Sequence, residues 1–379
     1  MDALTTPLPK DWQKVRLGDI GKPCMCKRVM KHQTTRYGEI PFYKIGTFGN
    51  TADAFISKKL FLEYKTKYSF PKKGDILISA SGTIGRAVIY DGKPAYFQDS
   101  NIVWIDNDET LVKNDFLFYA YSHVKWNTEH TTILRLYNDN FRNTLIPLPP
   151  INEQIAIANI LSDVDRYLYS LDALILKKES VKKALSFELL SQRKRLKGFN
   201  QAWQKVRLGD ICEIVKGQQI NKISLNNTDK YPVINGGIDF LGYTNKFNVS
   251  KNTIAISEGG TCGYVRFMTS DFWSGGHNYS LQKISNKVNN LCLYHILKSY
   301  EKDIMKLGVG SGLKNIQLKA LKDFEILLPP LNEQAAIANI LSALDSEIIS
   351  LKNKKRQFEN IKKALNHDLM SAKIRVLKE

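Results

Sequence analysis

The sequence lacks several features that would place it in a familiar class of protein. No apolar run is long enough to cross a bilayer, and Met1 to Lys10 lack the apolar stretch of a secretion signal. The five cysteines are odd in number and match no zinc pattern, and the six histidines are scattered. These absences argue against a membrane protein, a disulfide framework and a metal site. We therefore expect a cytoplasmic protein with free, buried thiols.

Motifs of nucleotide-dependent enzymes are also missing. The chain has no Walker A loop and no Asn/Asp-Pro-Pro-Tyr/Phe motif of methyltransferases. The run from Gly308 to Gly312 resembles a nucleotide loop superficially, but it lacks the full dinucleotide pattern and opens no long helix. A flexible turn is the better interpretation. With no convincing nucleophile, base or metal cluster, the chain is not expected to be an enzyme.

Charge of one sign is in excess. Among 379 residues, 55 Lys and Arg face 37 Asp and Glu, a formal net charge of +18. Such an excess favours a polyanionic partner, because neutralised phosphates release counterions. A generally basic protein from a Lys-rich proteome remains an alternative, which charge alone does not separate.

The strongest positive signal is an internal repeat. Residues 12–20 and 203–211 share the same sequence, W-Q-K-V-R-L-G-D-I. Residues 149–165, P-P-I-N-E-Q-I-A-I-A-N-I-L-S-D-V-D, match residues 329–345, P-P-L-N-E-Q-A-A-I-A-N-I-L-S-A-L-D. Matches of this length indicate two half-molecules joined head to tail.

Between these shared anchors, each half carries a variable segment with a mixed pattern. Residues 75–80 and 252–257 are predicted to be buried strands, each followed by a glycine turn and a second strand. Residues 114–123 and 290–300 are predicted to be helices. The pattern favours an α+β domain that occurs twice, with a shared fold and different surfaces.

Proline is absent from residues 151–195 and 331–379, where long helices are predicted. Apolar residues recur there at heptad spacing. In the first helix they are Leu161, Val164, Leu168, Leu171, Ile175, Val181, Leu185 and Leu189. In the second they are Leu341, Leu344, Ile348, Leu351, Phe358, Ile361, Leu365 and Leu369. The seam is interrupted by Lys178, Lys182, Lys355 and Lys362.

The repeat favours an antiparallel pairing of these helices with pseudo-two-fold symmetry. The alternative, each helix packing on its own domain, fits less well, since about 40 residues of helix span roughly 60 Å. The expected segments are a first domain over residues 1–150, a helix over 151–195, a second domain over 196–330 and a helix over 331–379. Two unlike basic domains on a stiff rod would suit equivalent grooves of a duplex, about 34 Å apart. RNA is not excluded by this geometry.

At this point the residues resemble a known family. Leu148-Pro149-Pro150 precedes Glu153-Gln154, Leu328-Pro329-Pro330 precedes Glu333-Gln334, and each half opens with W-x-x-V-x-L-G-D. The arrangement is similar to the specificity subunit of type I restriction-modification systems over essentially the full chain. The resemblance implies two target recognition domains for a bipartite, asymmetric site in double-stranded DNA, separated by a long antiparallel two-helix coiled coil.

The resemblance also implies partners. Two modification subunits would dock on the coiled coil, bind S-adenosylmethionine and methylate adenine. Restriction subunits, where present, would use ATP and Mg²⁺ to translocate and cut DNA. No cofactor, metal or catalytic residue is expected in this chain, and no membrane partner.

Candidate DNA contacts follow from the chemistry of base edges, where Arg or Lys suits guanine and Asn or Gln suits adenine. In the first half they form a polar loop: Lys27, Arg28, Lys31, His32, Gln33 and Arg36. The corresponding stretch of the second half contains Lys216, Gln218, Gln219, Asn221 and Lys222. A second candidate surface is the glycine turn, with Ser81, Thr83 and Arg86, and with Thr261 and Arg266. Ser311, Lys314 and Asn315 are a weaker set. Solvated loops and tight turns are the alternatives.

Two other functions remain open at this stage. One is the specificity component of a related, type IIB-like system, which only the partner subunits would distinguish. The other is a coiled-coil scaffold whose end domains bind proteins. A scaffold would show no steep loss of DNA affinity with salt, which separates it from a DNA reader.

Overall fold

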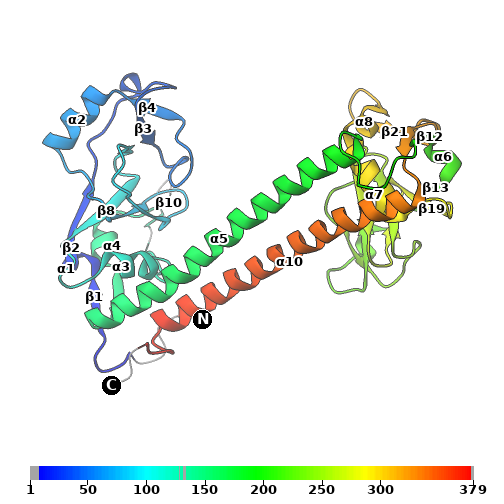
Figure 1. Ribbon diagram of the computed structural model, residues 1–379. Helices are drawn as coiled ribbons and strands as arrows, with labels where there is room; N and C mark the ends of the chain where they lie inside the picture. Colours follow the sequence, from blue (N-terminus) through cyan, green and yellow to red (C-terminus); the bar gives the residue numbers. More distant parts are fainter. Residues whose placement is uncertain (1–7, 128, 131–133, 377–379) are drawn as a thin grey trace. The chain divides into compact units, whose positions relative to one another are not determined.

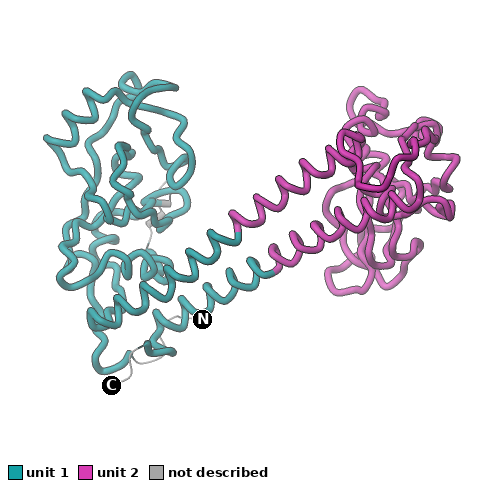
Figure 2. Tube along the Cα trace, viewed as in Figure 1, with its two compact units in different colours: residues 1–171, 354–379 teal, residues 172–353 magenta. Residues whose placement is uncertain are grey.

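The computed structural model describes residues 8–127, 129–130 and 134–376. The expectation about a secretion signal concerns Met1 to Lys10, most of which lie outside the described residues. The chain forms two compact units (Figure 2). Unit 1 comprises residues 1–171 and 354–379, and unit 2 comprises residues 172–353.

Unit 1 is an α+β unit built on a four-stranded antiparallel sheet of order β2-β8-β5-β6 (Figure 1). These strands are β2 (Gly21–Met25), β8 (Ile102–Asn107), β5 (Ile76–Ser79) and β6 (Ala87–Ile89). A second sheet, β4-β3-β7, comprises β4 (Ala54–Ile56), β3 (Ile40–Tyr43) and β7 (Tyr96–Phe97). Two ribbons complete the strands: β1 (Gln13–Arg16) with β11 (Leu145–Leu148), and β9 (Glu129–His130) with β10 (Leu134–Arg135). The short helices are α1 (Leu17–Ile20), η1 (Lys31–Gln33), α2 (Lys58–Lys67), α3 (Asn114–Tyr121) and α4 (Asn138–Asn143).

Unit 2 repeats this plan strand for strand. Its main sheet has the order β13-β19-β16-β17, from β13 (Glu213–Lys216), β19 (Asn278–Gln282), β16 (Thr253–Ser257) and β17 (Val265–Met268). The second sheet comprises β15 (Gly242–Thr244), β14 (Tyr231–Ile234) and β18 (Trp273–Ser274). The ribbons are β12 (Gln204–Arg207) with β22 (Glu325–Leu328), and β20 (Gly308–Val309) with β21 (Asn315–Ile316). The short helices are α6 (Leu208–Ile211), η2 (Lys222–Ser224), α7 (Asn290–Ser299), α8 (Glu301–Lys306) and α9 (Leu318–Lys322).

The long helices α5 (Ile151–Leu190) and α10 (Leu331–Met370) have 40 residues each. Each begins in one unit and ends in the other (Figure 2). In unit 1 the first half of α5 packs on the last part of α10, where the rings of Tyr167 and Phe358 lie 4.6 Å apart. In unit 2 the end of α5 meets the beginning of α10, and Lys178 Nζ lies 2.7 Å from Glu347 Oε1. The pairing is therefore antiparallel, and the α+β fold with packed long helices is confirmed.

The helix seam differs from the heptad prediction near its ends. Val181 and Ile361 were expected to face the partner helix, yet they are 45% and 50% exposed. The neighbouring lysines face the partner instead, since Lys182 pairs with Asp345 and Lys362 Nζ lies 2.5 Å from Asp165 Oδ1. Lys182 and Lys362 thus do not interrupt the helix pairing, because each contributes an ion pair with the partner helix.

The core of each unit includes the start of a long helix. Ile157, Ala158 and Leu161 of α5 are buried in the core of unit 1, together with Leu369 of α10. Ile337, Ala338 and Leu341 of α10 occupy the same places in unit 2, together with Leu190 of α5. The shared I-A-x-x-L sequence is therefore explained by burial against the domain.

Candidate nucleic-acid interface

The polar loop of unit 1 runs from the end of β2 to β3, over residues 26–39, around the short helix η1. Lys31, His32 and Arg36 are exposed on it. Lys27 is exposed too, and its Nζ lies 5.0 Å from the centre of the Tyr68 ring. Gln33 has a local structural role, because its Oε1 accepts a hydrogen bond from Met30 N at 2.8 Å. The loop thus presents several cations to solvent.

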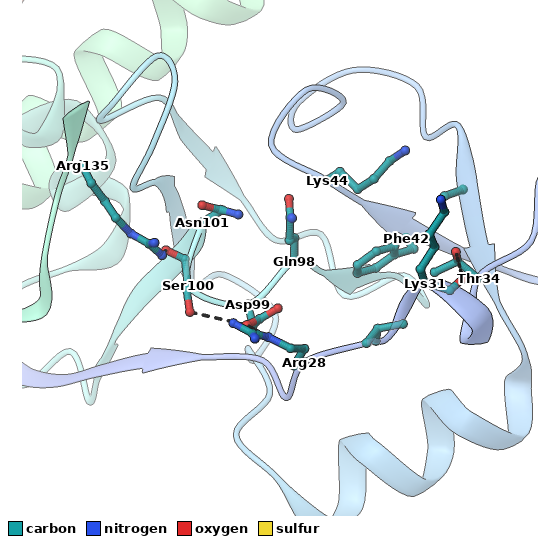
Figure 3. A pocket seen from close by; sticks show the side chains of 12 residues that line it. Arg28, Lys31, Thr34, Phe42, Lys44, Gln98, Asp99, Ser100, Asn101 and Arg135 are labelled. Atoms are coloured by element: carbon teal, nitrogen blue, oxygen red, sulfur yellow. Dashed lines mark hydrogen bonds and ion pairs between the residues drawn. The ribbon is translucent and has the colours of Figure 1, made fainter. Parts of the chain in front are cut away.

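Arg28 and Lys31 line a depression of about 520 Å³ in unit 1 (Figure 3). Arg28 Nε donates to Asp99 Oδ2 at 2.8 Å, while its side chain stays 67% exposed. Side chains that the sequence did not single out complete the depression. Four of them are Lys44, Gln98, Asn101 and Arg135.

These four residues come from three different parts of the chain. Lys44 follows β3, Gln98 and Asn101 lie between β7 and β8, and Arg135 ends β10. In Figure 3, Gln98 and Asn101 lie between Arg135 and Lys44. Arg135 Nη2 donates to Ser100 O at 2.6 Å, and Asn101 Oδ1 accepts from Ser81 Oγ at 2.8 Å. No motif marked them, because only the folded sheets bring them together.

The glycine turn of unit 1 connects β5 to β6. Gly82 and Gly85 adopt positive φ angles of 65° and 82°, so the turn requires glycine. Thr83 and Arg86 line a smaller depression of about 260 Å³. Arg86 Nη1 donates to Phe48 O at 2.9 Å, which ties the turn to the loop after β3.

The corresponding loop of unit 2 follows β13. Lys216 Nζ lies 2.7 Å from Glu258 Oε1, so much of its charge is neutralised within the unit. Gln218 and Gln219 are exposed, and Gln218 O accepts a hydrogen bond from Trp273 Nε1 at 2.9 Å. Asn221 is the N-cap of η2, where its side chain accepts from Ile223 N, and Lys222 is exposed. The exposed amides of this loop contrast with the exposed cations of unit 1.

Arg266, on β17, is half-buried and holds the loop after β14. Its Nη2 donates to Gly237 O at 2.9 Å and also bonds Ile238 O. Its guanidinium lies 5.5 Å from the Phe240 ring, and burial lowers its pKa. Arg266 and Arg86 thus anchor equivalent loops through carbonyl oxygens. Lys314 lies in the turn between β20 and β21 and is exposed.

No group of His, Cys, Asp and Glu in the described part of the chain could hold a metal ion. The thiols of Cys26, Cys212 and Cys292 are buried, and burial raises their pKa values to about 12. They therefore stay protonated and are poor ligands or nucleophiles. Among the described helices, none is long and apolar enough to span a membrane.

Comparison with known proteins gives a consistent result. The family model described as "Type I restriction modification DNA specificity domain" matches residues 9–178 and again residues 200–360. A putative type I restriction enzyme specificity subunit of Methanocaldococcus jannaschii is 29% identical, and the alignment covers 97% of this chain and 95% of the relative. A putative specificity subunit of Haemophilus influenzae is 63% identical over 148 residues, which are 39% of this chain and only 38% of that protein.

The fold also occurs among solved structures. The type I restriction-modification S subunit from M. genitalium superimposes with a TM-score of 0.72 at 20% identity, over 97% of this chain and 98% of that one. At this identity the likeness concerns the fold alone.

Proposed function

Because the chain belongs to the family of type I restriction-modification DNA specificity proteins, we propose that its two units recognise the two parts of a split, asymmetric DNA site. The chain is the non-catalytic specificity component of its system. One observation carries the proposal. The units share their strand order and their anchoring sequences, while their exposed polar loops differ in chemistry. Two units with the same fold and different exposed loops suit a DNA site whose two halves differ in sequence.

The DNA contacts are proposed in two groups. Lys27, Lys31, His32, Arg36, Lys222 and Lys314 are exposed and suit phosphate oxygens. Arg28, Gln218 and Gln219 present donors and acceptors suited to base edges. Arg86 and Arg266 hold loops in place through carbonyl oxygens, so we expect them to affect DNA through loop position, while Thr83 lines the depression beside Arg86. Gln33 and Asn221 have partners within their loops, and Lys216 pairs with Glu258 just after β16, so all three are expected to shape the loops.

We further propose that α5 and α10 dock two modification subunits, which bind S-adenosylmethionine and methylate adenine. Restriction subunits, where the system has them, supply the ATP- and Mg²⁺-dependent steps, and the complex works in the cytoplasm. Large apolar side chains on the outward faces of the helices support docking. Tyr169 is 78% exposed, Leu176 67% and Ile349 59%. These apolar side chains are available for a partner protein to cover.

The proposal is tested by mapping methylated adenines in cells that carry or lack this gene, with the modification subunits present in both. We expect methylation at a split motif only when the gene is present. Active modification subunits that leave every split motif unchanged would contradict the function.

A salt titration of the assembled complex on DNA separates this function from a protein-binding scaffold. A DNA reader making several phosphate contacts should lose affinity by orders of magnitude between about 50 and 200 mM salt. A shallow dependence would favour the scaffold.

A further inference from the structure

Positions in the unit 1 depression have equivalent positions in unit 2, because the two units repeat the same strand order. Leu136 N donates to Ala80 O at 2.8 Å, and Ile316 N donates to Glu258 O at 2.9 Å. The residues just before these donors, Arg135 and Asn315, are therefore equivalent. The backbone thus aligns residues that sequence comparison leaves unmatched.

Three more equivalent pairs follow in the same way. Ala80 N donates to Asn101 O, and Glu258 N donates to His277 O, each at 2.8 Å. Lys44 and Asn235 each follow the parallel strand of the second sheet. Arg28 and Gln219 each lie three residues past the end of the edge strand, β2 or β13. The full set is Arg28 with Gln219, Lys44 with Asn235, Asn101 with His277, and Arg135 with Asn315.

The two sets differ in one chemical respect. Unit 1 has three cations and one amide, whereas unit 2 has three amides and one imidazole. All eight side chains are exposed or half-exposed. The charge contrast extends beneath them, because Glu258 occupies the place of Ala80 and neutralises Lys216. The four equivalent positions of unit 2 therefore carry little charge, whereas those of unit 1 are basic.

The partners of Lys44 and Arg135 do not prevent these two cations from meeting DNA. Lys44 Nζ lies 2.8 Å from Asp53 Oδ1, with the two side chains 41% and 59% exposed. Ion pairs this exposed contribute little to stability, so their cations reorient toward a stronger acceptor at low cost. Arg135 uses one amino group on Ser100 O, which leaves other donors of its guanidinium fork for a base edge.

On the proposed function, we infer that these equivalent positions determine specificity: the unit 1 set reads guanine, centred on Arg135, and the unit 2 set reads adenine, centred on Asn315. Guanine presents two acceptors, N7 and O6, in the major groove, which match an arginine fork. Adenine presents N7 and an N6 donor, which match the amide of asparagine. Gly259 makes room for Asn315, because a Cβ there would lie 2.2 Å from Asn315 Oδ1.

The first experiment maps methylated adenines for the complex containing Arg135→Ala, Asn315→Ala or the control Lys67→Gln. Lys67 is an exposed cation paired with Glu63 on α2, outside the depression. Arg135→Ala is expected to relax one G·C requirement in one half-site, and Asn315→Ala one A·T requirement in the other. Each should lower methylation of the original site roughly 5- to 150-fold. Lys67→Gln should leave the motif unchanged.

Arg135→Lys retains the positive charge and therefore separates base reading from a phosphate contact. It also replaces Arg135→Ala in the experiment if the alanine variant folds poorly. Base reading predicts a weakened G·C requirement with lysine, because an ammonium group can reach guanine acceptors but lacks the bidentate fork of arginine. A phosphate contact predicts an unchanged motif, and for Arg135→Ala a uniform loss of affinity with a salt slope smaller by about 1. That second pattern would overturn the inference.

The second experiment measures binding of the complex to DNA with single 7-deazaguanine or 7-deazaadenine substitutions, which lack N7. Wild-type binding should weaken at one guanine, and Arg135→Ala should be insensitive there. Asn315→Ala should be insensitive at one adenine of the other half. Equal sensitivity of wild type and variants, or an effect of one variant on both halves, would refute the assignment. The proposed function would still stand, because it fails only if the wild-type complex yields no split motif.

Discussion

Trp12 donates its indole N–H to Glu153 Oε2 at 3.0 Å, and Trp203 donates in the same way to Glu333 Oε2 at 3.0 Å. Each glutamate begins a long helix and is only 1% exposed. Its charge is balanced by an arginine that follows the other long helix. Arg375 contacts Glu153 in unit 1, and Arg195 contacts Glu333 in unit 2. The shared tryptophan and glutamate thus form the joint between domain and helix.

Replacement of these glutamates tests the joint. Glu153→Gln should lower the stability of unit 1 by about 2–4 kcal/mol, because Arg375 loses its ion pair with a buried carboxylate. Glu333→Gln should do the same in unit 2. Thermal and denaturant unfolding measure both. Asp210→Asn is the matched control, since Asp210 pairs with Arg207 at the surface. An equal effect of the control would contradict the joint.

Leu161 and Leu341 test whether the helix starts belong to the domain cores. Both are fully buried. Leu161→Ala and Leu341→Ala should each cost about 2–5 kcal/mol, since the cavity adds to the lost burial. Denaturant unfolding is the measurement. Leu176→Ala, at a 67% exposed position of α5, should change stability by less than about 0.5 kcal/mol.

His295 is expected to make the stability of unit 2 depend on pH. It is buried on α7 beside Ser342, with Nε2 3.1 Å from Oγ, and burial lowers its pKa to about 4. The unfolded chain binds this proton near pH 6.5. The folded state therefore loses stability as the pH falls from about 6.5 to about 4, and this group causes no further loss below about pH 4.

The size of this effect follows from the displacement of the pKa. It corresponds to about 3 kcal/mol at the acid end of the window. Unfolding of wild type and His295→Gln should be compared across pH 4 to 7. The difference in the free energy of unfolding between wild type and His295→Gln should change with pH inside that window and stay constant above it. A difference that is independent of pH would show that His295 is not buried as a neutral ring.

Gly85 tests the close approach at the glycine turn. A Cβ on Gly85 would lie 2.0 Å from Trp126 Nε1, and Trp126 packs against Tyr121 and Phe141. Gly85→Ala should destabilise unit 1 by about 1–3 kcal/mol, from the clash and the positive φ together. Gly46→Ala is the control, because nothing lies within 4 Å of its Cβ position. Its unfolding midpoint should match that of wild type.

Much of the fold could be predicted because the chain repeats itself. The proline-free stretches predicted helices that the structure places at Ile151–Leu190 and Leu331–Met370. The predicted strands over residues 75–80 and 252–257 are β5 and β16. Hydrophobic spacing did not reveal that Lys182 and Lys362 face the seam, because an inward lysine depends on the acidic residue opposite. The domain limits at residues 150, 195 and 330 stay a prediction.

The reading surface was less predictable for a physical reason. Loop residues such as Arg28 and Gln219 could be chosen because they follow a shared anchor in the sequence. Arg135 could not, because it is brought to the depression by a bridge to Ser81, more than 50 residues earlier in the chain. All of the candidate contacts remain predictions until DNA binding is measured.

The division of α10 between the units has a consequence for synthesis on the ribosome. Residues 172–353 contain everything that unit 2 packs into its core, so this part can fold while translation continues. Unit 1 begins first and finishes last, because Leu369, Met370 and Arg375 come from the end of the chain. Until they emerge, Glu153 lacks its contact with Arg375 and part of the first core stays open to water.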